Sequence, residues 1–114
     1  MTETASCIMC RERGWLQISD PYFEAIREQW SNIRGLYLTF GSKKPIILYD
    51  IQEKKIYAYP YMEFKEDLSK NSQESLEHDY KSASAHGSMI VFVRDNIERK
   101  LVSYTLSIDS TTIH

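Results

Sequence analysis

The chain has 114 residues, of which 42% are hydrophobic and 26% charged, and its formal net charge is −2. These proportions are typical of one globular domain, rather than of a disordered or membrane chain. No apolar run reaches the roughly 20 residues that a transmembrane helix needs. A domain of this size buries enough surface to fold without a metal or a disulfide, so we expect no cofactor. The near-neutral charge gives no general attraction to nucleic acid.

The terminal segments differ in composition from the middle of the chain. The first residues lack the charged and apolar stretches of a secretory signal, so we expect a cytoplasmic protein. Cys7 and Cys10, which are the only two cysteines, are then expected to be free thiols. We predict a flexible arm over 1–13, a single α+β domain over 14–107 and a loose tail over 108–114.

The first regular element is predicted to be a helix over residues 21–34. Asp20 and Pro21 suit the cap and the first helical position, because the carboxylate accepts from free amides and proline lacks only a donor that is not needed there. Gly35 suits the end of the helix. The apolar residues that recur at helical spacing are Phe23, Ile26, Trp30 and Ile33.

Alternation with a period of two predicts three consecutive strands, over 36–40, 45–50 and 54–59. The polar segments between them predict hairpin connections. In this interpretation the aliphatic residues face the interior, and the opposite face of the strands is rich in tyrosine.

Helical spacing returns after Tyr61 and predicts a short helix over 61–68 and a longer one over 72–85. Asn71 and Glu74 are spaced for a reciprocal cap at the start of the second helix. Two further strands follow. The uniformly apolar segment 89–93 is typical of a central strand, and residues 101–106 complete a hairpin with it.

These elements follow the order α-β-β-β-α-β-β, in which each helix offers a single apolar stripe to the sheet. The predicted fold class is therefore an α+β two-layer sandwich, with a mainly antiparallel five-stranded sheet and helices packed on it. The pattern leaves open whether the helices share one face of the sheet or divide between both. No internal repeat is evident in the sequence.

The pair Cys7-x-x-Cys10 has the spacing of half a zinc site, since two thiolates two residues apart can reach one tetrahedral ion. A complete site needs two more ligands, and the remaining candidates, His78, His86 and His114, are not at a paired spacing. Free thiols are the simpler interpretation, and a zinc ion shared by two chains is the alternative. His86 is expected to satisfy carbonyl groups at the end of a helix.

Two predicted hairpin corners combine acidic and basic residues, and each contains a Glu-x-Lys step. In metal-dependent nucleases, carboxylates of this kind hold Mg²⁺ while the lysine stabilises developing charge. Charged turns are also ordinary features of hairpins, so the nuclease interpretation is an alternative only. The residues are Asp50, Glu53, Lys55, Asp95, Glu98 and Lys100.

Tyrosine is the most distinctive residue type in the predicted sheet. Its ring packs on a pleated surface while its hydroxyl stays hydrated, so tyrosines on one face either stabilise the sheet or bind another molecule. Base stacking on single-stranded nucleic acid, assisted by lysines at the strand ends, is a further possibility. The candidate binding residues are Tyr37, Tyr49, Tyr57, Tyr59, Lys43, Lys44, Lys54 and Lys55.

The sequence therefore favours a small non-catalytic module that binds another protein through a tyrosine-bearing sheet face and self-associates as a homodimer. A hydrolytic enzyme that uses the acidic corners is the first alternative. Binding of single-stranded nucleic acid is the second. No membrane partner is expected.

Overall fold

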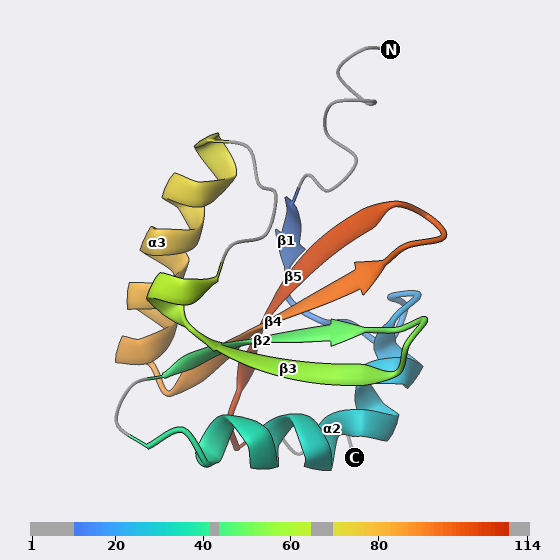
Figure 1. Ribbon diagram of the computed structural model, residues 1–114, viewed down its shortest axis with the longest axis horizontal. Coiled ribbons are helices and arrows are strands. Elements are labelled where there is room, and N and C mark those ends of the chain that lie inside the picture. The colour runs from blue at the N-terminus through green and yellow to red at the C-terminus, as the bar shows by residue number, and fades with distance from the viewer. Residues whose placement is uncertain (1–10, 42–43, 65–69, 110–114) are drawn as a thin grey trace.

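Two helices lie on opposite faces of one sheet in the computed structural model, which describes residues 11–41, 44–64 and 70–109 (Figure 1). The elements are β1 (Arg11–Gly14), α2 (Phe23–Leu38), β2 (Pro45–Asp50), β3 (Lys55–Pro60), the 3-10 helix η1 (Tyr61–Glu63), α3 (Lys70–Ala85), β4 (Ser88–Asp95) and β5 (Lys100–Ser107). The protein is thus an α+β protein with a mixed sheet and two helices.

The sheet has the strand order β1-β5-β4-β2-β3. The β2–β3 and β4–β5 pairs are antiparallel hairpins, whereas the β2–β4 and β1–β5 pairs are parallel. The strands predicted over 45–50, 54–59, 89–93 and 101–106 are β2, β3, β4 and β5. The sheet is mixed, so the predicted antiparallel pairing holds for the two hairpins but not for the parallel pair that joins them at the centre.

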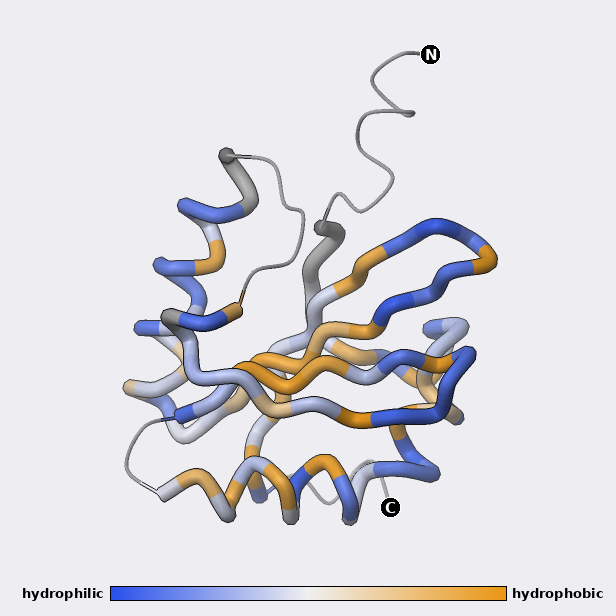
Figure 2. The backbone as a smooth tube through the Cα atoms, in the orientation of Figure 1, coloured by the Kyte–Doolittle hydropathy of each residue, from blue (hydrophilic) through white to orange (hydrophobic). Residues whose placement is uncertain are grey.

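Each helix packs on a different face of the sheet, which gives three layers. Helix α2 buries the stripe Ile26, Trp30, Ile33 and Tyr37 against residues such as Val91. On the other face, the α3 residues Leu76 and Ala83 pack in one cluster with Leu48 and Phe92. Hydrophobic residues concentrate along the central strands between these helices, as Figure 2 shows. The predicted two-layer sandwich is therefore wrong, since both faces of the sheet are covered.

The strand predicted over 36–40 is the last part of helix α2. Tyr37 continues the buried stripe of Ile26, Trp30 and Ile33 at helical spacing and is only 3% exposed. Gly35 lies inside the helix rather than at its end. The apolar residues after Ile33 fit the helical period as well as the strand period of two. Packing of Tyr37 on the sheet favours the helix.

Helix α2 begins at Phe23, two residues later than the sequence predicts. Its N-cap residue is Tyr22, which makes no side-chain cap hydrogen bond. The Asp20 carboxylate instead accepts the Gln17 N–H at 2.5 Å, which closes a turn before the helix. The predicted cap at Asp20 is therefore wrong.

The remaining boundaries also differ from the sequence prediction. Residues 61–63 form a 3-10 turn in the region where a helix over 61–68 is predicted, and α3 begins at Lys70. The end of that predicted helix and the side chain of Asn71 lie outside the described residues. Strand β1 pairs with the outer edge of β5, so part of the predicted N-terminal arm belongs to the sheet.

The order α2-β2-β3 is repeated as α3-β4-β5, and each unit consists of a helix followed by a hairpin. The turns of the two hairpins also match, because the segment Asp50-Ile-Gln-Glu-Lys-Lys corresponds to Asp95-Asn-Ile-Glu-Arg-Lys. A glycine with positive φ follows each helix, Gly41 at 73° and Gly87 at 68°. These common features define an internal αββ repeat.

The two repeats are related by an approximate two-fold axis that runs along the strands between β2 and β4. The parallel pairing of β2 with β4 and the symmetric strand order β5-β4-β2-β3 both require this arrangement. The axis exchanges the faces of the sheet: Ile47 packs in the α2 cluster, and its equivalent Phe92 packs in the α3 cluster. The outer edge of β3 is thus equivalent to the outer edge of β5.

Candidate functional site

The four candidate tyrosines do not share one surface. Tyr37 lies in α2, and Tyr49 is only 4% exposed on the α2 side of the sheet. Tyr57 and Tyr59 are partly exposed on the α3 side. The hairpin register pairs Tyr57 with Leu48 rather than with Tyr49, and directly paired residues share a face. The predicted single tyrosine face is therefore wrong.

The tyrosines of β3 instead belong to an aromatic cluster on the α3 side, which we call the β3 aromatic cluster. Its members are all half-buried and are Tyr57, Tyr59, Tyr61, Phe64 and Tyr80. The Tyr57 and Tyr59 ring centroids lie 6.1 Å apart, and those of Tyr61 and Tyr80 lie 4.6 Å apart. The Phe64 ring contacts the rings of Tyr59 and of the fully buried Phe92, with centroid distances of 6.0 Å and 4.7 Å respectively.

The cluster is held in place by the core and by two hydroxyl hydrogen bonds. The Tyr80 hydroxyl donates to the Lys44 carbonyl at 2.7 Å, which joins α3 to the start of β2. The Tyr57 hydroxyl donates to Glu53 Oε1 at 3.2 Å. The aromatic surface is consequently ordered before any partner arrives. Sequence analysis missed Tyr61, Phe64 and Tyr80, because it assigned all three to helices and only the tertiary structure places Tyr80 next to β3.

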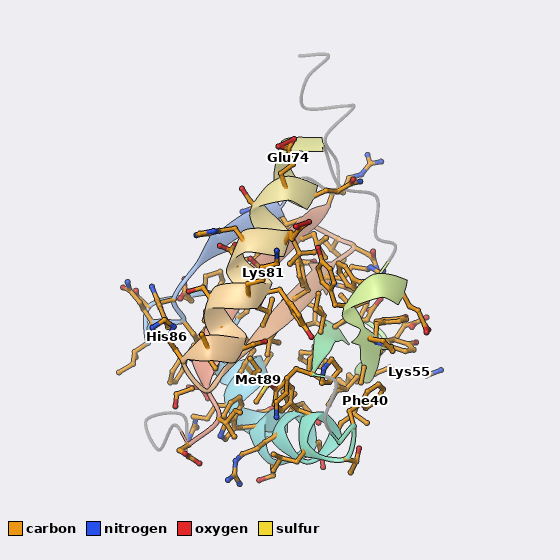
Figure 3. All side chains as sticks on the ribbon, turned by 90° about the vertical axis from the view of Figure 1, so that its left-hand side faces the viewer. Phe40, Lys55, Glu74, Lys81, His86 and Met89 are labelled. Carbon is orange, nitrogen blue, oxygen red and sulfur yellow. The ribbon has the colours of Figure 1, made fainter. Side chains whose placement is uncertain are left out.

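Strand β3 forms one end of the sheet, so its outer edge has no paired strand within residues 11–41, 44–64 and 70–109. Lys55 is exposed at its start, and residues 56–60 are partly exposed. Figure 3 shows the Lys55 side chain pointing away from the body of the protein on this side.

The register of the hairpin determines which main-chain groups face this edge. Pro45 pairs with Pro60, and neither residue has an N–H, so this pair is not hydrogen-bonded. Hydrogen-bonded and non-hydrogen-bonded pairs alternate along an antiparallel ladder. The N–H and C=O groups of Ile56 and Ala58 therefore point away from β2, toward solvent.

The candidate lysines lie at both ends of this hairpin. The Lys44 Nζ atom is 5.6 Å from the centre of the Tyr37 ring, close to the end of β3 at which Pro60 lies. Lys54 and Lys55 lie at the opposite end, in the turn and at the start of β3. Lys43 falls outside the described residues.

The two hairpin turns meet at one end of the sheet, and their aspartates hold them together. Asp95 is 6% exposed, and its Oδ2 atom accepts the Tyr22 hydroxyl at 2.8 Å. The Oδ1 atom accepts Gln52 Nε2 at 2.9 Å and the N–H groups of Ile97 and Glu98, both at 3.1 Å. Burial raises the pKa of Asp95, whereas these hydrogen bonds lower it. The hydrogen bonds have the larger combined effect, so the pKa of Asp95 lies below its usual value.

Asp50, the equivalent residue in the first repeat, has the same role. Its Oδ1 atom accepts the N–H groups of Gln52 and Glu53 at 3.1 and 3.0 Å. Its Oδ2 atom accepts Asn96 Nδ2 at 3.2 Å and lies 3.5 Å from an Arg94 nitrogen. Both carboxylates therefore anchor turns, with their oxygens occupied by donors.

This arrangement brings together the acidic corners on which the nuclease alternative depends. In the part of the chain that the structure describes, no group of three or more His, Cys, Asp or Glu residues is placed to hold a metal ion. The alternative remains a prediction, and the contacts of Asp50 and Asp95 give these residues a structural role. Cys7 and Cys10 lie outside the described residues.

The fifth residue of each turn adopts a left-handed conformation without being glycine, with φ of 56° at Lys54 and 58° at Arg99. Such a conformation costs a residue with a Cβ atom about 1 kcal/mol. We expect Lys54→Gly and Arg99→Gly each to raise the free energy of unfolding by up to about 1 kcal/mol. Urea denaturation followed by circular dichroism measures this change, with Lys81→Gly in α3 as a control that destabilises. Lower stability in both turn variants would show that the left-handed conformation of Lys54 and Arg99 is not strained.

A cleft of about 520 Å³ lies between α3 and the β1–β5 edge, and its walls include Trp15, Asp79, Ser82 and His86. The His86 Nδ1 atom lies 2.8 Å from the Ser82 carbonyl oxygen. This contact is the expected role of His86 at a helix end, and it uses the main chain of Ser82 rather than its hydroxyl. In the described lining of this cleft, the His86 ring thus contacts a main-chain carbonyl of α3 rather than a serine hydroxyl.

No known protein family, curated protein or solved structure matches this chain. Among the helices that the structure describes, none has the length and apolar character required to cross a membrane. Function must therefore be inferred from the geometry of the protein itself.

Proposed function

We propose that this protein is a non-catalytic module that binds another protein through β3 and the β3 aromatic cluster. The observation that carries the proposal is a sheet edge to which no strand of the described residues is paired, together with a pre-ordered group of half-exposed aromatic rings beside it. The two features are adjacent because Tyr57 and Tyr59 belong to the edge strand itself. We propose a cytoplasmic location, as the sequence predicts.

An open edge offers main-chain hydrogen bonds to an incoming strand, and this is a common mode of protein recognition. Aromatic rings supply apolar area at low conformational cost, and tyrosine is enriched at protein interfaces for this reason. The Phe64 ring packs on the buried Phe92 and the Tyr59 ring packs on Phe64, so binding orders few additional side chains. This rigidity reduces the entropic cost of association.

Other features of the surface favour a protein over nucleic acid as the partner. Lys54 and Lys55 are next to Glu53 in the turn, and Glu63 is exposed at the opposite end of β3. A nucleic-acid surface gains most of its affinity from a continuous row of positive groups, whereas this edge carries both positive and negative groups. Mixed charges around an apolar centre are typical of the rim of a protein interface.

The experiment compares the double variant Tyr57→Ser/Tyr59→Ser with the control Trp15→Ser, which changes an exposed aromatic residue far from β3. Each protein is immobilised and exposed to a lysate of the native host and to the purified chain itself. Any protein that the wild type retains is then purified and titrated against all three forms by calorimetry.

We expect the control to bind like the wild type and the double variant to bind at least about tenfold more weakly, since aromatic anchors dominate such interfaces. Circular dichroism verifies that the double variant is folded. Equal affinity of the double variant and the wild type would contradict the proposal, as would the absence of any bound protein, including a second copy.

A further inference from the structure

We propose that a second copy of this chain occupies the outer edge of β3, so that two β3 strands pair antiparallel about a two-fold axis at Ala58. This inference rests on the proposed function and specifies its partner. Two five-stranded sheets then join into one continuous sheet, with the two β3 aromatic clusters on the same side.

The internal repeat provides the first argument. The edge of β5 is equivalent to the edge of β3, and it is paired with β1 over residues Leu101–Tyr104. The turn alignment relates these residues to Ile56–Tyr59 of β3. The protein thus contains one example of an added strand on this type of edge, and the equivalent position on β3 is open within the described residues.

The main-chain groups provide the second argument. Ile56 and Ala58 direct their N–H and C=O groups outward, as the proline pair at the end of the hairpin requires. With Ala58 opposite the second copy's Ala58, these two residues exchange both main-chain hydrogen bonds. The Ile56 N–H then donates to the carbonyl of the second copy's Pro60, so the missing proline N–H leaves this bond intact.

The side chains fit the same register. Tyr57 lies opposite the second copy's Tyr59 in a non-hydrogen-bonded pair, the type in which side chains are closest. The methyl group of Ala58 lies on the axis, where two identical side chains approach each other and a larger one would be crowded. Each aromatic cluster thereby extends across the axis to the other.

Charge selects the antiparallel direction. Glu53, Lys54 and Lys55 together carry one net positive charge at the start of β3, and the exposed Glu63 is at its end. Because Glu63 lies in η1, just after β3, antiparallel pairing places the positive start of each strand beside the η1 segment of the other chain. Parallel pairing would place like charges together at both ends, which is unfavourable.

The first experiment measures the mass of the purified full chain by sedimentation equilibrium from low to high micromolar concentration. We expect a reversible dimer. Ala58→Pro removes only the outward N–H and no bond to β2, since edge positions tolerate proline. We expect this variant to raise the dimer dissociation constant at least about tenfold, because the symmetric interface loses two donors. Trp15→Ser, which is remote from β3, is the control that leaves the constant unchanged.

A charge-reversal series tests the direction of pairing and uses only exposed residues, so it remains decisive if Ala58→Pro does not fold. Lys55→Glu alone and Glu63→Lys alone are each expected to weaken the dimer several-fold, and the double variant is expected to restore it. A parallel dimer would not show this rescue.

Three results would overturn the inference: a single-chain mass at every concentration, a dimer that Ala58→Pro leaves unchanged although it is folded, or charge reversal without rescue. The proposed function and the dimer can be distinguished by experiment. If the chain is monomeric but loses a captured partner when Tyr57 and Tyr59 are replaced, the dimer is wrong and the binding module stands. If neither occurs, both proposals fail.

Discussion

Replacement of Asp95 with alanine is expected to lower the free energy of unfolding by about 3 kcal/mol, because it leaves one buried hydroxyl and several partly buried donors without their acceptor. The variant removes the acceptor of the Tyr22 hydroxyl and of the Gln52 amide, together with the contacts that close its own turn. Chemical denaturation measures the loss. Glu98→Ala, which truncates an exposed carboxylate in the same turn, is expected to change stability by less than about 0.5 kcal/mol.

The lowered pKa of Asp95 also predicts how the free energy of unfolding depends on pH. The pKa of Asp95 is lower in the folded protein than its ordinary value of about 3.9, so its ionised form stabilises the fold above that value. This contribution is lost as the pH falls through the lowered pKa of the folded state. We expect the difference in stability between the wild type and Asp95→Ala to shrink in this acidic range. If the difference in unfolding free energy between the two proteins stayed constant from neutral to acidic pH, the ionised Asp95 carboxylate would not be the stabilising form.

Trp30→Ala is expected to cost about 3–5 kcal/mol of unfolding free energy, the range measured for large aromatic residues truncated in a core. The side chain is 1% exposed and lies in the cluster that joins α2 to the sheet. Its indole Nε1 atom has no hydrogen-bond partner among residues 11–41, 44–64 and 70–109, so we expect the loss to arise from packing. Trp30→Phe should therefore cost clearly less than Trp30→Ala.

Trp15 provides the matched control for this change, because the chain contains two tryptophans and Trp15 is 67% exposed. Trp15→Ala is expected to alter stability by less than about 0.5 kcal/mol. Thermal unfolding of both variants by circular dichroism compares them directly. A similar loss in both variants would show that burial does not decide the effect.

Local patterns in the sequence were sufficient for the four long strands and for the presence of both helices. They failed where two periods overlap, as at Leu36 and Tyr37, whose spacing fits a strand and a helix equally well. The helix forms at these residues because Tyr37 extends an apolar stripe that is buried against the sheet. This burial is a tertiary effect, and the alternation of a few neighbouring residues gives no information about it.

The candidate site was predicted only in part for a similar reason. Tyr57 and Tyr59 lie in β3 and are partly exposed. The face on which Tyr49 lies depends on the hairpin register, since a shift of one residue reverses its face. The parallel contact between β2 and β4 joins segments far apart in the chain, so no local pattern predicts it. The matching turns at Asp50 and Asp95 were the one sequence clue to the repeat.

The exchange of faces between the two repeats has a consequence for how the chain unfolds. Each hairpin is covered by its own helix on one side and depends on the other repeat for cover on the opposite side. Neither half can therefore lose its structure without exposing apolar surface of the other. Denaturation should proceed as one all-or-none transition, and a fragment that ends after β3 should remain unstructured in isolation.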